Sequence, residues 1–235
     1  MDSEKLKKLA GKNGARLCGI ASIDRFKDAP KGFSPIDLFP KTKSVISFAK
    51  QVPKGTLNLT NTIPYSVIEE IALHETHRIA LELALFIESF GYNAVIVPSE
   101  PYDYWDEENK TGKGLVSLKH IAFKCGLGSW GKNHLIYNAQ IGNLMKIGAV
   151  LTDAILESDK ILYNQICKED CDLCISSCPT GALNSLGVEQ RLCRQFSQGK
   201  TLKDEPIYSC NMCRKVCPNV YGFKSTEISS VYLSN

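Results

Sequence analysis

The sequence has no hydrophobic run long enough to cross a membrane, because Glu82 and Glu88 interrupt the longest candidate. Its first residues, MDSEKLKKLAGKNG, contain neither the apolar segment nor the paired arginines of an export signal. We therefore expect a cytoplasmic protein without a membrane partner, in a compartment that keeps thiols reduced.

The sequence also lacks the short motifs of several enzyme classes. It has no P-loop and no G-x-S-x-G element, and its four histidines form no H-E-x-x-H zinc site. A net charge of +3 is too small to predict a nucleic-acid partner. With 43% hydrophobic residues the chain can still form a packed interior, so its chemistry must come from another residue type.

Cysteine is the residue type that the sequence concentrates. Eight of the ten cysteines lie between positions 167 and 217, in two runs that each end in Cys-Pro. Such runs are typical of bacterial two-cluster ferredoxins, in which the fourth cysteine of each run binds the other run's iron–sulfur cluster. This crossing assigns to one [4Fe–4S] cluster the ligands Cys167, Cys171, Cys174 and Cys217. It assigns to the second cluster the ligands Cys178, Cys193, Cys210 and Cys213.

Two other uses of these cysteines remain open. Zinc also takes four thiolates, although zinc ribbons usually present two separated C-x2-C pairs. A disulfide framework is typical of short secreted chains, whereas this chain has 235 residues. The spacing from Cys167 to Cys171 is one residue longer than in bacterial ferredoxins, so the ferredoxin pattern is broken at that ligand.

Hydrophobic patterning predicts an α/β core ahead of the cysteines. We expect helices at residues 2–14, 62–91 and 115–125, and strands at 16–21, 44–49, 92–97 and 144–152. Residues 98–114 predict a long loop, and Gly142-Asn143 predicts a turn that joins strands at 134–137 and 144–152. The pattern changes near residue 160, which divides the chain into a core (1–160) and a cluster domain (161–235).

Gly126, Gly128 and Gly131 satisfy the spacing G-x-G-x-x-G. A dinucleotide-binding fingerprint requires a strand before the glycines and a helix after them. Here the predicted helix precedes the motif and a strand follows it. We therefore expect the glycines to allow the backbone to approach either a cofactor or a packed helix closely.

With the cysteine pattern, residues 125–154 (CGLGSWGKNHLIYNAQIGNLMKIGAVLTDA) resemble the epoxyqueuosine reductases and, more distantly, the reductive dehalogenases. The segments CGIA at 18–21 and FPKTKSVISFA at 39–49 resemble the early strands of those families. The resemblance implies an α+β fold, with a nitroreductase-like cobalamin-binding core and a C-terminal ferredoxin-type module. It also implies that the corrinoid has no protein histidine beneath its cobalt. The residues that would line or approach it are Gly128, Ser129, Lys132, Asn133 and His134.

The chain departs from that family at two places. Where those reductases carry a catalytic aspartate, about fourteen residues before the glycine turn, this chain has Gly112. Our candidate for the missing proton donor is Tyr104, with Tyr102 and Lys113 as alternatives. The helical-repeat region that holds tRNA in that family does not follow the cysteines, so we do not expect tRNA to be a partner.

Three hypotheses about function follow. The first is an iron–sulfur oxidoreductase that accepts electrons from a donor such as ferredoxin or flavodoxin. It would pass them through two [4Fe–4S] clusters to a corrinoid that reduces a small-molecule substrate. The second is a non-enzymatic electron-transfer or reductive-activation partner of another redox protein. The third places FMN in the same core, since nitroreductase-type folds often hold flavin.

Overall fold

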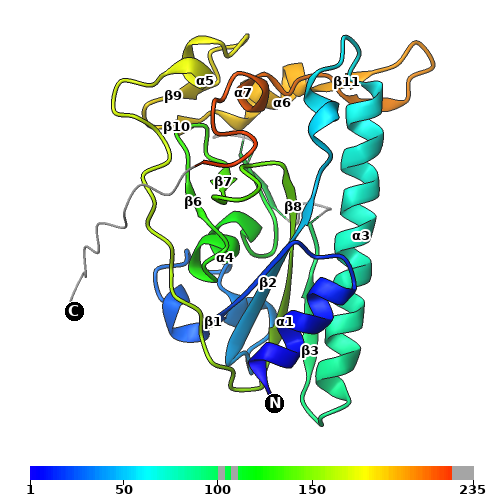
Figure 1. The fold of residues 1–235 in the computed structure, drawn as a ribbon, viewed down its shortest axis with the longest axis vertical. Helices are drawn as coiled ribbons and strands as arrows, with labels where there is room; N and C mark the ends of the chain where they lie inside the picture. Colours follow the sequence, from blue (N-terminus) through cyan, green and yellow to red (C-terminus); the bar gives the residue numbers. More distant parts are fainter. Residues whose placement is uncertain (100–103, 107–110, 224–235) are drawn as a thin grey trace.

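A computed structural model of the chain describes residues 1–99, 104–106 and 111–223 (Figure 1). At its centre, four antiparallel strands form a sheet in the order β1-β2-β8-β3. These strands are β1 (Leu17–Ser22), β2 (Ser44–Gln51), β8 (Met145–Thr152) and β3 (Ala94–Val97). Among the described residues, no helix combines the length and the apolar character that a membrane span requires.

Two helices cover one face of the sheet, α1 (Ser3–Lys12) and α3 (Ile63–Glu88). Successive side chains of a strand point to opposite faces, and in β2 it is Ile46 and Phe48 that pack under these helices. Across from Phe48 lies Gly148, where an added Cβ would meet the Phe48 ring at 2.5 Å. The glycine therefore makes room for the aromatic ring beneath α3.

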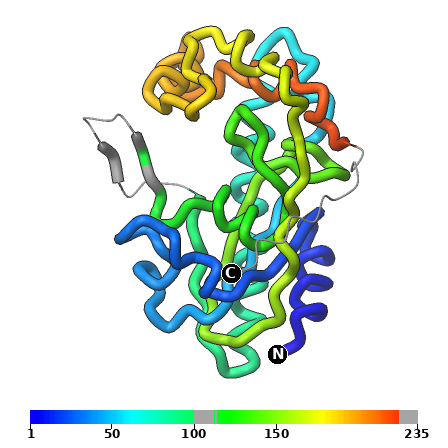
Figure 2. Tube along the Cα trace, turned by 90° about the vertical axis from the view of Figure 1, so that its left-hand side faces the viewer, coloured from blue at the N-terminus to red at the C-terminus, as the bar shows by residue number. Residues whose placement is uncertain are grey.

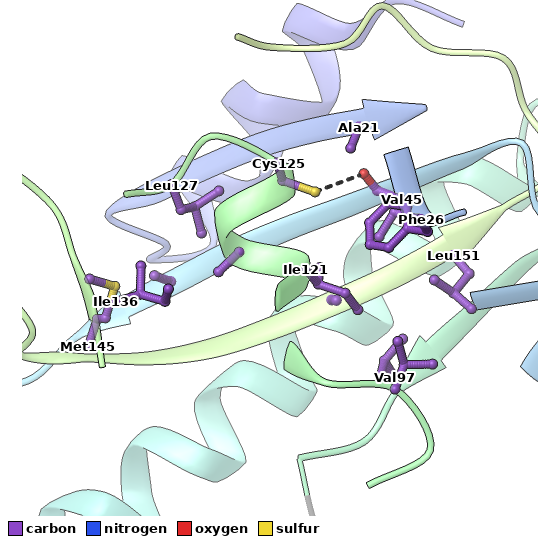
Figure 3. Packing of buried hydrophobic residues seen from close by; sticks show 14 of the residues in the cluster. Ala21, Phe26, Val45, Val97, Ile121, Cys125, Leu127, Ile136, Met145 and Leu151 are labelled. Carbon is purple, nitrogen blue, oxygen red and sulfur yellow. Dashed lines mark hydrogen bonds between the residues drawn. The ribbon is translucent and has the colours of Figure 1, made fainter. Parts of the chain in front are cut away.

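The other face packs against α4 (Leu118–Lys124), with the short helices η1 (Ile23–Phe26) and α2 (Pro35–Leu38) nearby (Figure 3). Cys125 lies fully buried in this cluster, and its Sγ donates a hydrogen bond to the Val45 carbonyl oxygen at 3.4 Å. Burial raises the pKa of its thiol. This cysteine is thus part of the hydrophobic core, away from the eight later ones.

Two predictions about connections were wrong. Within the predicted loop 98–114, β4 (Tyr104–Asp106) pairs with β5 (Thr111–Lys113) as an antiparallel hairpin. The segment before Gly142 is β7 (Ile136–Tyr137), which pairs with β6 (Ser129–Trp130) and not with β8. Gly142 has a positive φ of 62°, and an added Cβ there would collide with the backbone of Val220. Gly142 therefore allows close contact with the backbone of Val220, a tertiary contact that the local sequence pattern cannot reveal.

An extended segment, residues 155–166, leads from the sheet to the cysteine-rich part of the chain (Figures 1 and 2). It runs beside β1, where the Asp159 carboxylate accepts hydrogen bonds from the Ile20 backbone N–H at 2.9 Å and from Lys7 Nζ at 2.6 Å. The Ser158 hydroxyl oxygen accepts another from the Ser22 N–H at 2.8 Å. The boundary that we place near residue 160 falls in this segment and remains a prediction.

The cysteine-rich module caps one end of the molecule, next to the first turn of α3 (Figure 1). It is built from short elements: α5 (Leu173–Ser176), β9 (Leu183–Asn184), β10 (Gly187–Val188), α6 (Gln190–Ser197), β11 (Gln198–Lys200), β12 (Pro206–Tyr208) and α7 (Met212–Lys215). The Ser66 hydroxyl joins it to α3, because it accepts from the Tyr208 N–H at 2.8 Å and donates to the Tyr208 carbonyl at 3.3 Å. One further helical turn, η2 (Lys54–Leu57), follows β2.

Gly148→Ala should reduce the free energy of unfolding by about 1–3 kcal/mol, because the new methyl group overpacks the contact with Phe48. Gly55→Ala is the matched control, since an added Cβ at Gly55 meets nothing within 4 Å, and it should stay within about 0.5 kcal/mol of wild type. Urea unfolding followed by circular dichroism measures both. Equal stabilities of the two variants would contradict the packing described here.

Candidate metal centre

Three cysteines of the first run and the last cysteine of the second run line one cavity. Its lining includes Cys167, Cys171, Cys174 and Cys217. Tyr137 and Asn133 of the core complete the wall together with Leu173. The fold thus brings Cys217 to a run that lies more than forty residues earlier in the sequence.

The remaining four cysteines form a second neighbourhood. Burial raises the pKa of Cys193, and the negative charges of Cys210 and Cys178 raise it further. Burial also raises the pKa of Cys213 to about 11, with contributions from Cys193, Cys210 and Cys174. Cys193 is therefore within electrostatic reach of Cys178, Cys210 and Cys213, and Cys213 also lies near Cys174 of the first run.

The two halves of the module repeat one local design. In each half a four-residue helix, α5 or α7, carries a cysteine at its second position, Cys174 or Cys213. The next cysteine follows the helix and donates its backbone N–H to the helix, Cys178 to Ile175 and Cys217 to Arg214, both at 3.1 Å. Proline comes next and cannot continue the helix, so each run stops at its fourth cysteine.

Hydrogen-bond donors surround several of the sulfur atoms. The Lys132 backbone N–H donates to Cys167 Sγ at 3.4 Å. Although burial raises the pKa of Cys178, hydrogen bonds from the backbone of Leu183, Thr180 and Ala182 bring it below its usual value. Donors of this kind stabilise the thiolate form, which is the form that binds metals.

The glycine turn of residues 126–134 is fastened to the module. Lys132 Nζ donates to three backbone carbonyls of the first run, those of Lys168 (3.2 Å), Glu169 (2.7 Å) and Cys171 (2.9 Å). Asn133 Nδ2 donates to the Cys213 carbonyl at 3.0 Å, and the Ser129 hydroxyl donates to the Leu162 carbonyl at 2.6 Å. The side chains of Ser129, Lys132 and Asn133 are therefore engaged with the protein itself.

The glycines of this turn allow close backbone contacts. An added Cβ on Gly126 would collide with the Lys160 carbonyl, and one on Gly128 with the Tyr137 carbonyl. Gly131 faces the Tyr137 ring, which an added Cβ would meet at 2.6 Å. The partner that the glycines admit is thus the protein's own backbone and one aromatic ring.

His134 ends the turn at a positive φ of 56°. Its imidazole lies near Gly187 of β10, where an added Cβ would meet the ring at 3.7 Å, and its carbonyl accepts a hydrogen bond from Lys119 Nζ at 3.0 Å. Burial and the nearby charge of Arg214 lower the pKa of Lys119. Close by in the fold, the Gly112 N–H donates to Gln190 Oε1 of α6 at 3.1 Å, so the β4–β5 hairpin also contacts the module.

The sequence offers three candidates for the proton donor, Tyr102, Tyr104 and Lys113. Tyr102 lies outside the described residues. For Tyr104 and Lys113 the structure describes the strand backbone but not the side chain. Each of the three remains a prediction.

A buried ionic network next to the second cysteine group escaped sequence reasoning. Glu69 of α3 is 5% exposed, and its carboxylate lies 3.5 Å from Arg214 Nη1 and 3.4 Å from Lys146 Nζ. Arg214 follows Cys213 directly in the chain. The sequence did contain one signal of this network. Glu69 is a charged residue on the mostly apolar, inward face of the predicted helix.

Comparison with protein-family models finds no match. Among curated proteins, an epoxyqueuosine reductase from Francisella cf. novicida is 28% identical over 224 residues, which cover 86% of this chain and 59% of that protein. Other epoxyqueuosine reductases match shorter segments. The chain thus covers between 29% and 59% of the length of the curated relatives that it matches most strongly.

Solved structures show the same fold. An epoxyqueuosine reductase in complex with an epoxyqueuosine-modified stem loop of tRNA-Tyr has a TM-score of 0.65 at 20% identity, over 95% of this chain and 67% of that one. A reductive dehalogenase whose structure suggested a mechanism for B12-dependent dehalogenation has a TM-score of 0.71 at 18% identity, over 97% of this chain and 32% of that one.

These relatives correct one expectation. We expected tRNA not to be a partner of this chain. Since the matched proteins are epoxyqueuosine reductases, and one of them holds a tRNA stem loop, that expectation was wrong. The chain is similar in sequence to epoxyqueuosine reductases and has the mixed α/β fold of epoxyqueuosine reductase and reductive dehalogenase structures, which confirms the predicted resemblance to these proteins.

Proposed function

We propose that the eight cysteines hold two [4Fe–4S] clusters whose ligands are exchanged between the two runs. The observation that carries this proposal is the cavity where Cys217 joins Cys167, Cys171 and Cys174. The electrostatic coupling of Cys193 to Cys178, Cys210 and Cys213 supports the complementary set. We refer to the first set as cluster I and to the second as cluster II.

The donor chemistry fits iron–sulfur clusters better than zinc. All ten cysteines are free of disulfide bonds, as metal ligands must be. Zinc holds its sulfurs at about 2.3 Å, which requires four sulfurs within about 4 Å of one another. Zinc ribbons also usually present two separated C-x2-C pairs, whereas each run here ends in C-x3-C-P. A four-iron cluster accepts one thiolate at each iron, so its ligands stand farther apart.

We infer a reductase of the type that its relatives' names describe. One of the structures with this fold is a B12-dependent enzyme, which supports a corrinoid in this chain as well. A bound corrinoid supplies a cobalt centre that can be reduced for attack on a substrate. Five residues are predicted to contact the corrinoid. Among them, His134 has its ring near Gly187 of the module, and its carbonyl oxygen accepts a hydrogen bond from Lys119 Nζ.

The residues of the turn have a different task in this proposal. Ser129, Lys132 and Asn133 could reach a corrinoid only by giving up their bonds to the module. We therefore assign to them the positioning of the clusters against the core. The nitroreductase-like character of that core remains part of the proposal, and the flavin alternative finds no support among the matched proteins.

The substrate is the open part of the proposal. The relatives' names make an epoxyqueuosine-modified tRNA stem loop the first substrate to test, and a small molecule the second. The non-enzymatic alternative, an electron-transfer partner of another redox protein, is favoured by Gly112, which cannot donate a proton from its side chain. Turnover of either substrate decides against it.

The exchange of ligands can be tested with single cysteine variants. Anaerobically purified wild-type chain should contain about eight irons. Cys217→Ala should damage cluster I, and Cys178→Ala should damage cluster II, as seen by paramagnetic resonance of the reduced proteins. Cys18→Ala, which changes a cysteine outside both runs, is the control and should keep both signals. Loss of the other cluster in each variant, or zinc in place of iron, would contradict the assignment.

We expect Arg214, whose side chain is 15% exposed, to change the reduction potential of cluster II. A cation close to a cluster stabilises its reduced, more negative form, so Arg214→Gln should lower the reduction potential of cluster II and leave cluster I nearly unchanged. Glu69→Gln should shift the same potential upward, because it removes the opposing charge. Lys215→Gln is the control, since Lys215 is the next residue of α7 but is exposed. A redox titration followed by paramagnetic resonance measures all three; equal shifts in Arg214→Gln and Lys215→Gln would refute this role.

The missing aspartate should limit turnover of modified tRNA. With cobalamin and a chemical reductant, wild-type chain should act on the epoxyqueuosine stem loop about 10² to 10⁴ times more slowly than an authentic epoxyqueuosine reductase, the usual loss without a general acid. Gly112→Asp should recover part of this rate, whereas the control Gly114→Asp should not. If the wild-type rate equals that of the reference enzyme, another residue supplies the proton.

A further inference from the structure

Helix α3 is apolar on both of its faces. Its inner face packs on the sheet through residues such as Ile79, Leu83 and Ile87, which are fully buried. A helix that is apolar all round is normally buried all round. In this chain, however, α3 lies along one edge of the molecule, with its outer face toward solvent (Figure 1).

Five large apolar side chains form a stripe on that outer face. They are between 43% and 53% exposed: Ile63, Val67, Ile71, Leu81 and Leu85. Their spacings of four residues within each group place them on one side of the helix. The helix has 26 residues and is about 39 Å long, so the stripe follows most of its length. Exposed polar residues, His74 and Arg78 among them, divide the stripe into two apolar patches, and exposed apolar patches bordered by polar residues mark interaction sites.

Four of the five stripe residues are placed symmetrically about His74, whereas Ile71 has His77 as its counterpart. Val67 and Leu81 each lie seven residues from His74, and Ile63 and Leu85 each lie eleven residues from it. Two exposed residues of opposite charge, Glu70 and Arg78, each lie four residues from it. In an antiparallel pair of identical helices centred on His74, these partners come to the same height along the helix axis.

We propose that the outer face of α3 binds the same face of a second copy of this chain, as an antiparallel pair with a twofold axis at His74. In a twofold interface, residue i of one copy meets residue j of the other, and j meets i. Each copy thus places Val67 beside Leu81 of its mate and Glu70 near Arg78, twice per dimer. A partner of a different kind would not require this match of the stripe with itself.

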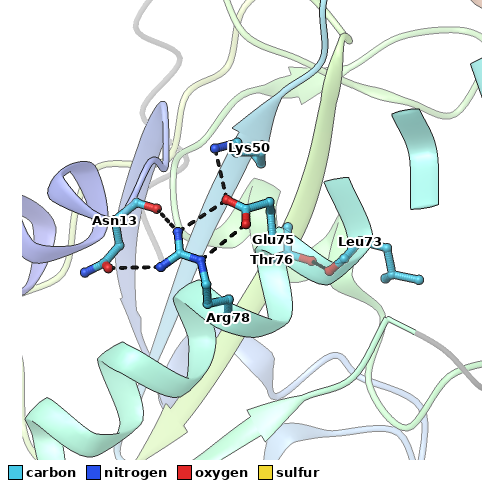
Figure 4. A network of polar contacts seen from close by, with 6 residues as sticks. All are labelled: Asn13, Lys50, Leu73, Glu75, Thr76 and Arg78. Atoms are coloured by element: carbon cyan, nitrogen blue, oxygen red, sulfur yellow. Dashed lines mark hydrogen bonds and ion pairs between the residues drawn. The ribbon is translucent and has the colours of Figure 1, made fainter. Parts of the chain in front are cut away.

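Contacts within one chain hold the charged side chains of Arg78 and Glu70 in position. Arg78 donates to the Asn13 carbonyl at 2.7 Å and to Glu75 at 3.3 Å, and its side chain is still 46% exposed (Figure 4). Glu70 lies 3.9 Å from His74 Nε2 on the outer face. Because one helix pair buries less surface than a standard interface, the dimer should dissociate in the micromolar range.

Complementary variants test both the dimer and its register. Val67→Lys alone and Leu81→Glu alone each place a charge against an apolar side chain twice, and each should weaken association about tenfold or more. When the two variants are mixed, the lysine of one chain meets the glutamate of the other, and the second contact is again Leu81 with Val67. The mixture should therefore form a dimer at protein concentrations at which each variant alone is monomeric.

Sedimentation equilibrium of the full chain, with its clusters and under anaerobic conditions, measures association across the micromolar range. Ile36→Glu is the control, because it removes an equally exposed apolar side chain from α2 and should leave dimerisation unchanged. Circular dichroism checks that the exposed substitutions leave the fold intact. Three outcomes would overturn the proposal: a wild-type chain that stays monomeric, a dimer that neither single variant weakens, or a weakened dimer that mixing the two variants does not restore.

Discussion

The contact between the glycine turn and the cysteine-rich module is the interaction on which the rest of the structure depends. The module consists of helices of four to eight residues and strands of two or three, which are too short to be stable without support. Lys132 supplies one charged donor to three carbonyls of the first run, and Asn133 reaches the second run at Cys213. One turn thereby fixes both halves of the module relative to the core.

A second constraint is the negative charge that the cysteines gather in a partly buried space. Unpaired buried charge is costly, so the fold must supply compensation. Near the first group this comes from the Lys132 N–H, and near Cys178 from backbone N–H groups. Near Cys213 it comes from Arg214, which Glu69 and Lys146 connect to the sheet and to α3. The compensation is therefore asymmetric: it is dipolar at the first group, and both dipolar and ionic at the second.

The sequence predicted what depends on neighbours in the chain. Short apolar runs rich in β-branched residues located the four strands of the sheet. The division of the cysteines into two ligand sets, which follows from their spacing, remains a prediction. Roles set by tertiary contacts were missed. Gly142 carries the same local signal whether it turns a hairpin or, as here, admits the backbone of Val220. Likewise, nothing local in the sequence shows that Leu162 and Cys213 accept hydrogen bonds from Ser129 and Asn133, whose contact with a cofactor remains a prediction.

The extended segment 155–166 does more than connect the core to the module. By bonding to the backbone N–H groups of Ile20 and Ser22, it occupies hydrogen-bonding positions on the free side of an edge strand, β1. Unpaired edge strands are where sheets of separate molecules join and aggregate. The opposite edge, β3, is only four residues long and offers little template for such pairing. The same stretch of chain that carries the cysteines away from the sheet thus also keeps that sheet from growing.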